Sequence, residues 1–128
     1  MKTNKVTPLD IKKMVAKAMG ATASEFESNK RVGLIIKHKH ISMFLCEKNI
    51  SISQQKLAQE FKLRRHTNII STRKKIEAFL SFAERGLESY IDYKLIIDSV
   101  QKEIDILKRN QYNDIYFVEM FVLGKSIN

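Results

Sequence analysis

Apolar residues recur three and four positions apart along most of the chain, and this is the spacing of one face of an α-helix. Thr7 and Pro8 are typical of a helix start, and Gly20 and Gly86 are typical of helix ends. The early part of the chain has no clear strand pattern. We therefore predict an all-α protein, a compact bundle of about six helices. They are expected at about residues 8–19, 24–28, 30–48, 54–61, 65–85 and 88–109.

The last stretch of the chain supports more than one interpretation. The run from Ile115 to Leu123 is rich in β-branched and aromatic residues, which favours a strand, but its length also suits a buried helical turn. That length and Glu119 both argue against a membrane anchor. We expect one domain over residues 1–110 and an apolar extension over residues 111–128 that covers the core or pairs with a second copy.

Two of the expected helices have the pattern of a helix-turn-helix. The helix over residues 54–61 is short, and a tight basic turn separates it from the helix that follows. Ala58 is small, as required where the two helices of such a unit pass close together. Apolar residues on both helices are expected to hold the unit together: Leu57, Phe61, Ile69, Ile70 and Ile76.

The turn and the start of the second helix carry an unbroken run of polar side chains. The first-turn side chains of a recognition helix reach the base edges when its N-terminus enters the DNA major groove. Residues able to hydrogen-bond at these positions therefore indicate base readout. They are Arg64, Arg65, His66, Thr67 and Asn68.

The positive charge of the chain is concentrated around this unit. The whole chain has a net charge of +9, and residues 29–75 hold 12 Lys or Arg against 2 acids. Residues 76–128, in contrast, hold 6 basic residues against 9 acids. An ordinary lysine-rich surface would explain the charge but not its confinement. Such a cluster favours a polyanion, which it binds with release of counterions.

Composition excludes several other classes of protein. The single cysteine, Cys46, permits neither an intramolecular disulfide nor a thiolate zinc site. His38 and His40 point in nearly opposite directions on a helix and make a poor metal pair, so they are expected on the surface or facing phosphate. No paired carboxylates lie near a histidine, and no signal peptide or membrane-spanning run is present. We expect a non-enzymatic, cytoplasmic, nucleoid-associated protein with no cofactor and no metal.

Several motifs are similar to those of one known family. Leu57-Ala58-x-x-Phe61, Arg64-x-His66-Thr67-x-Ile69-Ile70 and Lys74-Lys75-Ile76 resemble its signature, and Ser28-Asn29-Lys30-Arg31 resembles its upstream basic motif. The family is the C-terminal DNA-binding domain of the bacterial replication initiator DnaA. The resemblance covers about residues 11–104 and implies a Trp-repressor-like helix-turn-helix. No GxxxxGK[ST] loop is present, so the initiator's ATPase module is not expected in these 128 residues.

The resemblance implies roles for particular residues. His66 and Thr67 match residues that touch thymine methyl groups and base edges in the major groove. Arg31 matches an arginine that enters the adjacent minor groove, where a basic side chain suits the electronegative environment. The expected contacts to the DNA backbone are Lys39, Ser53 and Gln54, with Lys74 either joining them or simply solvating its helix.

Two positions depart from the family pattern. Arg65 stands where family members typically have Asp, and Asn68 stands where they have a second Thr. An acidic residue accepts from cytosine N4, whereas arginine donates to guanine N7 and O6 and asparagine suits adenine. We therefore expect the same docking mode with a different target sequence. Alternatively, the reversed charge has exchanged sequence discrimination for general attraction to phosphate.

The expected function is sequence-specific binding of double-stranded DNA in replication or transcription. The alternative is a protein-interaction adaptor that keeps the fold without binding DNA specifically and uses the apolar tail as its contact surface. Besides DNA, residues 112–123 are expected to contact a protein partner or a second copy. An enzyme is the least favoured class.

Overall fold

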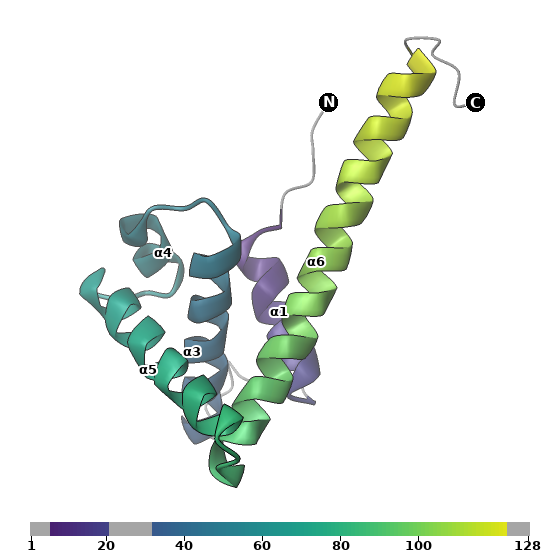
Figure 1. The fold of residues 1–128 in the computed structure, drawn as a ribbon. Coiled ribbons are helices and arrows are strands. Elements are labelled where there is room, and N and C mark those ends of the chain that lie inside the picture. The colour runs from purple at the N-terminus through teal and green to yellow at the C-terminus, as the bar shows by residue number, and fades with distance from the viewer. Residues whose placement is uncertain (1–5, 21–31, 123–128) are drawn as a thin grey trace.

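The computed structural model describes residues 6–20 and 32–122. Within these ranges it contains helices and no strand, so the predicted all-α class is confirmed (Figure 1). The helix predicted at residues 24–28 lies outside the described residues. The five described helices are α1 (Pro8–Ala18), α3 (Val32–Asn49), α4 (Gln54–Glu60), α5 (Thr67–Glu84) and α6 (Glu88–Val122).

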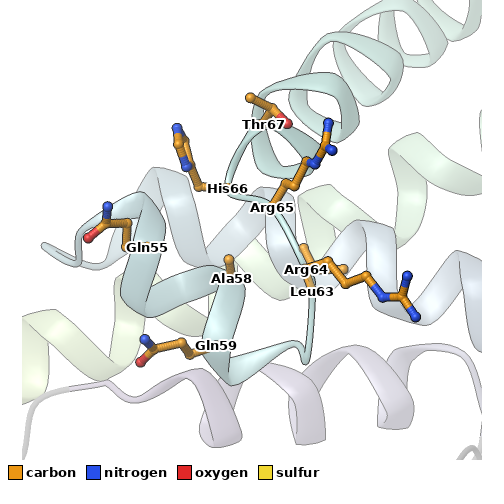
Figure 2. Close-up of a pocket in the computed structure, with 8 residues that line it drawn as sticks. All are labelled: Gln55, Ala58, Gln59, Leu63, Arg64, Arg65, His66 and Thr67. Carbon is orange, nitrogen blue, oxygen red and sulfur yellow. The ribbon is translucent and has the colours of Figure 1, made fainter.

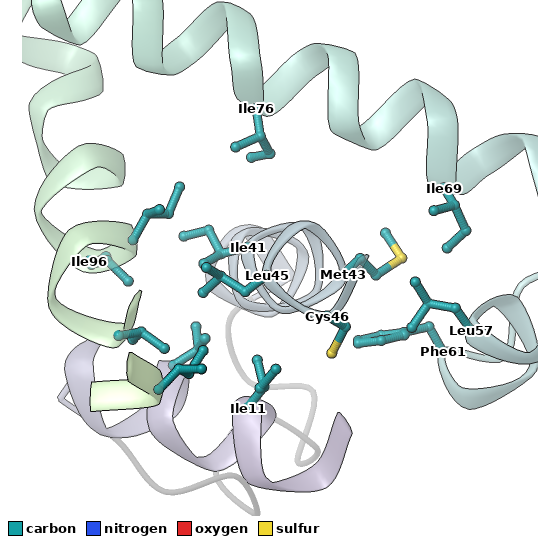
Figure 3. Close-up of a cluster of buried hydrophobic side chains, with 14 of the residues drawn as sticks. Ile11, Ile41, Met43, Leu45, Cys46, Leu57, Phe61, Ile69, Ile76 and Ile96 are labelled. Carbon is teal, nitrogen blue, oxygen red and sulfur yellow. The ribbon is translucent and has the colours of Figure 1, made fainter. Parts of the chain in front are cut away.

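Helix α3 forms the centre of the molecule, and every other described helix contacts it. Its residues from Ile41 to Met43 are all buried, and so are Leu45 and Cys46. In Figure 3, which looks along this helix, Met43 faces Leu57, Phe61 and Ile69, while Ile41 lies on the side of α6. A helix buried on most of its circumference belongs in the interior of a domain. Helix α3 therefore connects the α4–α5 unit to the α1–α6 side.

The start of α1 follows the sequence prediction. The Thr7 hydroxyl accepts a hydrogen bond from the Asp10 backbone N–H at 3.2 Å, and the Thr7 N–H donates to the Asp10 carboxylate at 3.0 Å. These reciprocal bonds form a capping box, with Pro8 in the first turn where a missing N–H is tolerated. Ile11 and Val15 then lie fully buried in the core. The cap therefore fixes where the apolar face of α1 begins.

Helix α6 differs from the prediction. It was expected to end near Arg109, followed by a strand or a short buried turn, but one helix continues to Val122. No glycine or proline interrupts the chain from Glu88 to Val122, and the β-propensity of the apolar run is too weak a preference to end a helix. At 1.5 Å per residue its length is roughly 50 Å. Figure 1 shows it extending well past the other helices.

The buried residues of α6 whose side chains are described lie in its first half. Ile96, Ile97, Val100 and Ile104 are buried on one face, whereas Arg109 is exposed. Among the described residues, no helix combines the length and apolar character needed to cross a lipid bilayer.

Candidate nucleic-acid interface

The turn between α4 and α5 is built by the backbone. The Leu63 N–H donates to the Ala58 carbonyl at 2.8 Å, and the Lys62 N–H donates to the Gln59 carbonyl at 3.1 Å. These two bonds form a Schellman motif, which needs a left-handed residue at the position of Lys62. Lys62 has φ 54°, a conformation that glycine adopts without cost and lysine does not. The motif ends α4 sharply and sends the chain toward α5.

Helix α5 begins two residues later than predicted. Thr67 is its first residue, and His66 is the N-cap but makes no side-chain capping bond. Arg64 and Arg65 were expected at or near the helix start and instead belong to the turn. The Ile69 N–H donates to the His66 carbonyl at 3.0 Å, so the backbone alone starts the helix. The side chains at this end therefore have no role in capping.

The polar run is exposed throughout. All residues from Arg64 to Asn68 lie at the surface, and within the described part of the chain their side chains form no hydrogen bond or ion pair. Nothing in the described fold covers this end of α5 (Figure 1). An exposed helix start whose donors and acceptors have no hydrogen-bond partner within the described fold is suited to contact an external polar surface.

The apolar residues beneath this run hold α4 and α5 together. Leu57, Phe61 and Ile69 are buried, and Figure 3 shows them gathered beside Met43 of α3. Ala58 is also buried, as its small size predicts, whereas Ile70 is only half-buried. The predicted packing of the helix-turn-helix is therefore confirmed, with Ile70 at its margin.

A shallow hollow lies between α4 and the start of α5, with a volume of about 360 Å³ (Figure 2). Its α4 side includes two exposed glutamines, Gln55 and Gln59, that the sequence analysis did not single out. They lie four residues apart on the α4 face that also carries Ala58, and that spacing could have identified them. The remaining lining residues are Ala58, Leu63, Arg64, Arg65, His66 and Thr67.

The structure places the other predicted contact residues less uniformly. Ser53 is exposed, and its hydroxyl accepts from the Lys56 N–H at 3.2 Å as the N-cap of α4. Gln54 is half-buried, while Lys74 is exposed on α5. Lys39 is half-buried on α3. Arg31 lies outside the described residues.

Part of the basic segment is neutralised within the protein. Lys37 pairs with Asp92 of α6, and its Nζ lies 4.6 Å from the centre of the Tyr93 ring. The Arg73 Nη1 lies 2.7 Å from the Glu47 Oε1. Lys37 therefore does not present a free charge to an external phosphate. Net charge therefore overstates the cations available to a ligand.

The two histidines of α3 are only partly exposed. The His38 Nε2 lies 2.8 Å from the Lys12 carbonyl, and both His38 and His40 are half-buried. Burial lowers the pKa of His40, and the nearby cations Lys75 and Lys39 lower it further. The cations that lower this pKa come from both α3 and α5.

A short helix, a tight turn and a second helix with an exposed polar start define a helix-turn-helix unit. Residues 8–76, more than half of the chain, match the family model described as the bacterial DnaA protein helix-turn-helix. The chain belongs to this family.

Full-length relatives show how much of such proteins the chain represents. It is 24% identical over 101 residues to a chromosomal replication initiator protein DnaA of Spiroplasma citri, covering 79% of this chain. It is 27% identical over 103 residues to the protein of the same name in Geotalea uraniireducens, covering 80% of this chain. Both matches span 21% of the relative. No solved structure matches significantly.

Proposed function

We propose that the protein binds double-stranded DNA and that the start of α5 reads base edges in the major groove. The main support for this proposal is that the side chains from Arg64 to Asn68 are exposed and form no hydrogen bond or ion pair within the described part of the chain. Membership in the DnaA helix-turn-helix family supports it, because two relatives are named chromosomal replication initiators. The protein then acts in replication, or in transcription, at sites that it selects itself.

Each part of the proposed interface has a distinct role. His66 and Thr67 contact base edges, and Arg31 contributes the minor-groove contact. Arg65 favours guanine and Asn68 favours adenine, so the target differs from that of family members with Asp and Thr at these positions.

Contacts to the DNA backbone supply affinity without sequence information. Basic residues on α3, the turn and α5 attract phosphates, and the start of α4 approaches the backbone. If about six phosphates are neutralised, the log–log dependence of affinity on salt has a slope near −5. The proposed backbone contacts are Lys39, Ser53, Gln54, Arg64 and Lys74.

Selection from a randomised duplex library tests the altered readout. The wild-type protein should select a motif distinct from the one bound by Arg65→Asp/Asn68→Thr, which restores the family residues. The comparison uses the selected motif rather than affinity, because the double variant also carries less positive charge. Identical motifs from both proteins would refute the assignment of Arg65 and Asn68 to base readout.

We further propose that residues 112–123 contact a protein partner or a second copy. The basis is that α6 continues to Val122, while its last buried residue among those with described side chains is Ile104. Analytical ultracentrifugation of the intact chain tests self-association. A protein that stays monomeric at all concentrations contradicts the second-copy form of this proposal.

An adaptor without DNA binding is the alternative function. Fluorescence anisotropy with mixed-sequence duplex at low salt separates the two, since an adaptor gives no saturable, salt-sensitive signal.

A further inference from the structure

Glu47 is an acid within the most basic part of the chain. Residues 29–75 hold only two acids, Glu47 and Glu60. Glu47 belongs to α3, and its Oε1 accepts a hydrogen bond from Arg73 Nη1 of α5 at 2.7 Å. The exposed fractions of the two side chains are 18% for Glu47 and 40% for Arg73. This partly buried bond therefore joins the central helix directly to α5, at whose start lie His66 and Thr67, the proposed base-contacting residues (called the reading residues below).

The other carboxylate oxygen of Glu47 makes this arrangement unusual. Glu47 Oε2 is buried and has no hydrogen-bond partner among the described residues. A buried polar atom without a partner is costly, and native proteins contain few of them. A pair that leaves one oxygen unsatisfied is a poor device for stability alone, because burial of ions costs solvation. We therefore look for the role of the Glu47–Arg73 pair in the position that it gives α5, and not in added stability.

The bond restrains α5 in a way that its apolar contacts do not. Ile69 and Thr72 are the buried residues of the first half of α5, and Ile76 is buried at the middle of the helix. Apolar packing is non-directional, so it constrains the rotation of a helix about its own axis less strictly than a directional bond does. A charge-assisted hydrogen bond is directional and short, so it fixes rotation. Arg73 lies six residues after Thr67, less than two helical turns from the exposed start.

We propose that Glu47 is a positioning residue that, through Arg73, sets the rotation of α5 and thereby the direction of His66 and Thr67. It is thus a determinant of sequence discrimination that does not touch DNA. The inference rests on the proposed DNA binding, and it deepens it by naming the group that orients the reading residues.

Two substitutions of opposite charge test the proposal. Glu47→Gln makes the protein more positive, and Arg73→Gln makes it less positive, but both end the same ion pair and the charge assistance of its hydrogen bond. Each should lower the ratio of affinities for the selected and a scrambled duplex by about fivefold to tenfold, the size expected from the net contribution of one ordinary hydrogen bond. If the two residues act only through net charge, overall affinity moves in opposite directions and the ratio stays constant, which overturns the proposal.

Asp92→Asn is the matched control. It breaks the Lys37–Asp92 pair, which joins α3 to α6 rather than to α5. It should leave the affinity ratio within about twofold of wild type. An equal fall in the ratio for this control would show that any weakening of the bundle relaxes discrimination, and would overturn a specific role for Glu47.

A measurement on the free protein separates this inference from the proposed function. In amide NMR spectra, Glu47→Gln and Arg73→Gln should shift the resonances of Arg65 to Asn68, and Asp92→Asn should not. Thermal unfolding of each variant checks that it is folded. Unchanged resonances in both pair variants overturn the positioning role whether or not DNA binds. If these variants shift the resonances but the wild-type protein binds no duplex, only the proposed function is refuted.

Discussion

The two ends of α5 are built for opposite purposes. At its C-terminal end Phe79 lies 4.9 Å from Tyr90 and 5.0 Å from Tyr93, measured between ring centres, and Phe82 lies 5.2 Å from Tyr90. Aromatic contacts of this kind bury large surfaces at tilted ring angles and stabilise the junction with α6. At the N-terminal end, by contrast, the polar side chains from Arg64 to Asn68 are exposed and form no hydrogen bond or ion pair within the described part of the chain.

The difference shows how a rigid presentation is achieved. The exposed end of α5 is held in place by contacts elsewhere on the helix, which are the aromatic contacts with α6, the buried residues of its inner face and the bond between Arg73 and Glu47. The reading residues need no internal contacts of their own, which would compete with an external ligand. Binding groups placed on rigid elements are held more accurately than groups on loops.

The largest expected effect comes from the shared core. Ile76 is fully buried between the two ends of α5, and Ile76→Ala should lower the free energy of unfolding by about 2–5 kcal/mol through lost burial and an unfilled cavity. Chemical denaturation measures this change. Ser71→Ala, at an exposed position on the same helix, should change stability by less than about 0.5 kcal/mol. A small effect at Ile76 would mean that the other contacts of α5, such as buried Ile69 and the aromatic junction with α6, hold the helix without it.

A change at the exposed end should affect binding and spare stability. His66→Ala should weaken binding to the selected duplex by roughly 1–3 kcal/mol and relax base preference, because a base contact is lost. Its unfolding curve should match that of wild type, since His66 makes no capping bond. An equal loss of affinity on every sequence would count against base readout.

A substitution at Lys74 tests how much contacts to the DNA backbone contribute to affinity. Lys74→Gln should weaken binding to all duplexes alike and make the log–log salt dependence shallower by about one unit. Lys102→Gln removes the same charge from an exposed position on α6 and should leave the slope unchanged. Equal slopes for both variants would remove Lys74 from the interface.

A substitution in the turn between α4 and α5 should have a smaller effect, and it should increase stability where Ile76→Ala decreases it. Lys62→Gly should raise the free energy of unfolding by up to about 1 kcal/mol, because glycine adopts the left-handed conformation at φ 54° without strain. The matched position Gly86 ends α5 with φ 84° and already has glycine. Gly86→Lys should therefore destabilise the protein. A destabilised Lys62→Gly variant would show that the lysine side chain supports the turn.

The smallest expected effect is a pH dependence of stability caused by His40 of α3. The pKa of His40 in the folded protein lies below its ordinary value of 6.5, so the unfolded chain binds the proton more tightly. Stability should therefore fall as pH drops below about 6.5, until the folded-state pKa is passed. Comparing thermal unfolding between pH 7.5 and 5 for wild type and His40→Gln measures the contribution. A slope that persists unchanged in His40→Gln would assign it to other groups.

Local chemistry made much of the fold predictable. Thr7, Pro8 and Asp10 placed the start of α1, and Leu57 with Ile69 placed the pairing of α4 and α5, because caps and periodicity act over a few residues.

The failures have a common physical origin in long-range contacts and weak preferences. The pairing of Lys37 with Asp92 spans 55 residues and that of Arg73 with Glu47 spans 26, so neither is visible in a local pattern. The end of α6 was misplaced because β-propensity does not override an uninterrupted helix. The left-handed turn was also missed, since lysine rather than glycine occupies it.

The core cysteine has a practical consequence. Cys46 is fully buried, and burial raises its pKa to about 12, so its thiol stays protonated and shielded at neutral pH. Alkylating reagents act on thiolates, and they should therefore label a new cysteine introduced at a surface position without removal of the native one. The rate at which Cys46 itself reacts would then measure the rate of global opening of the bundle.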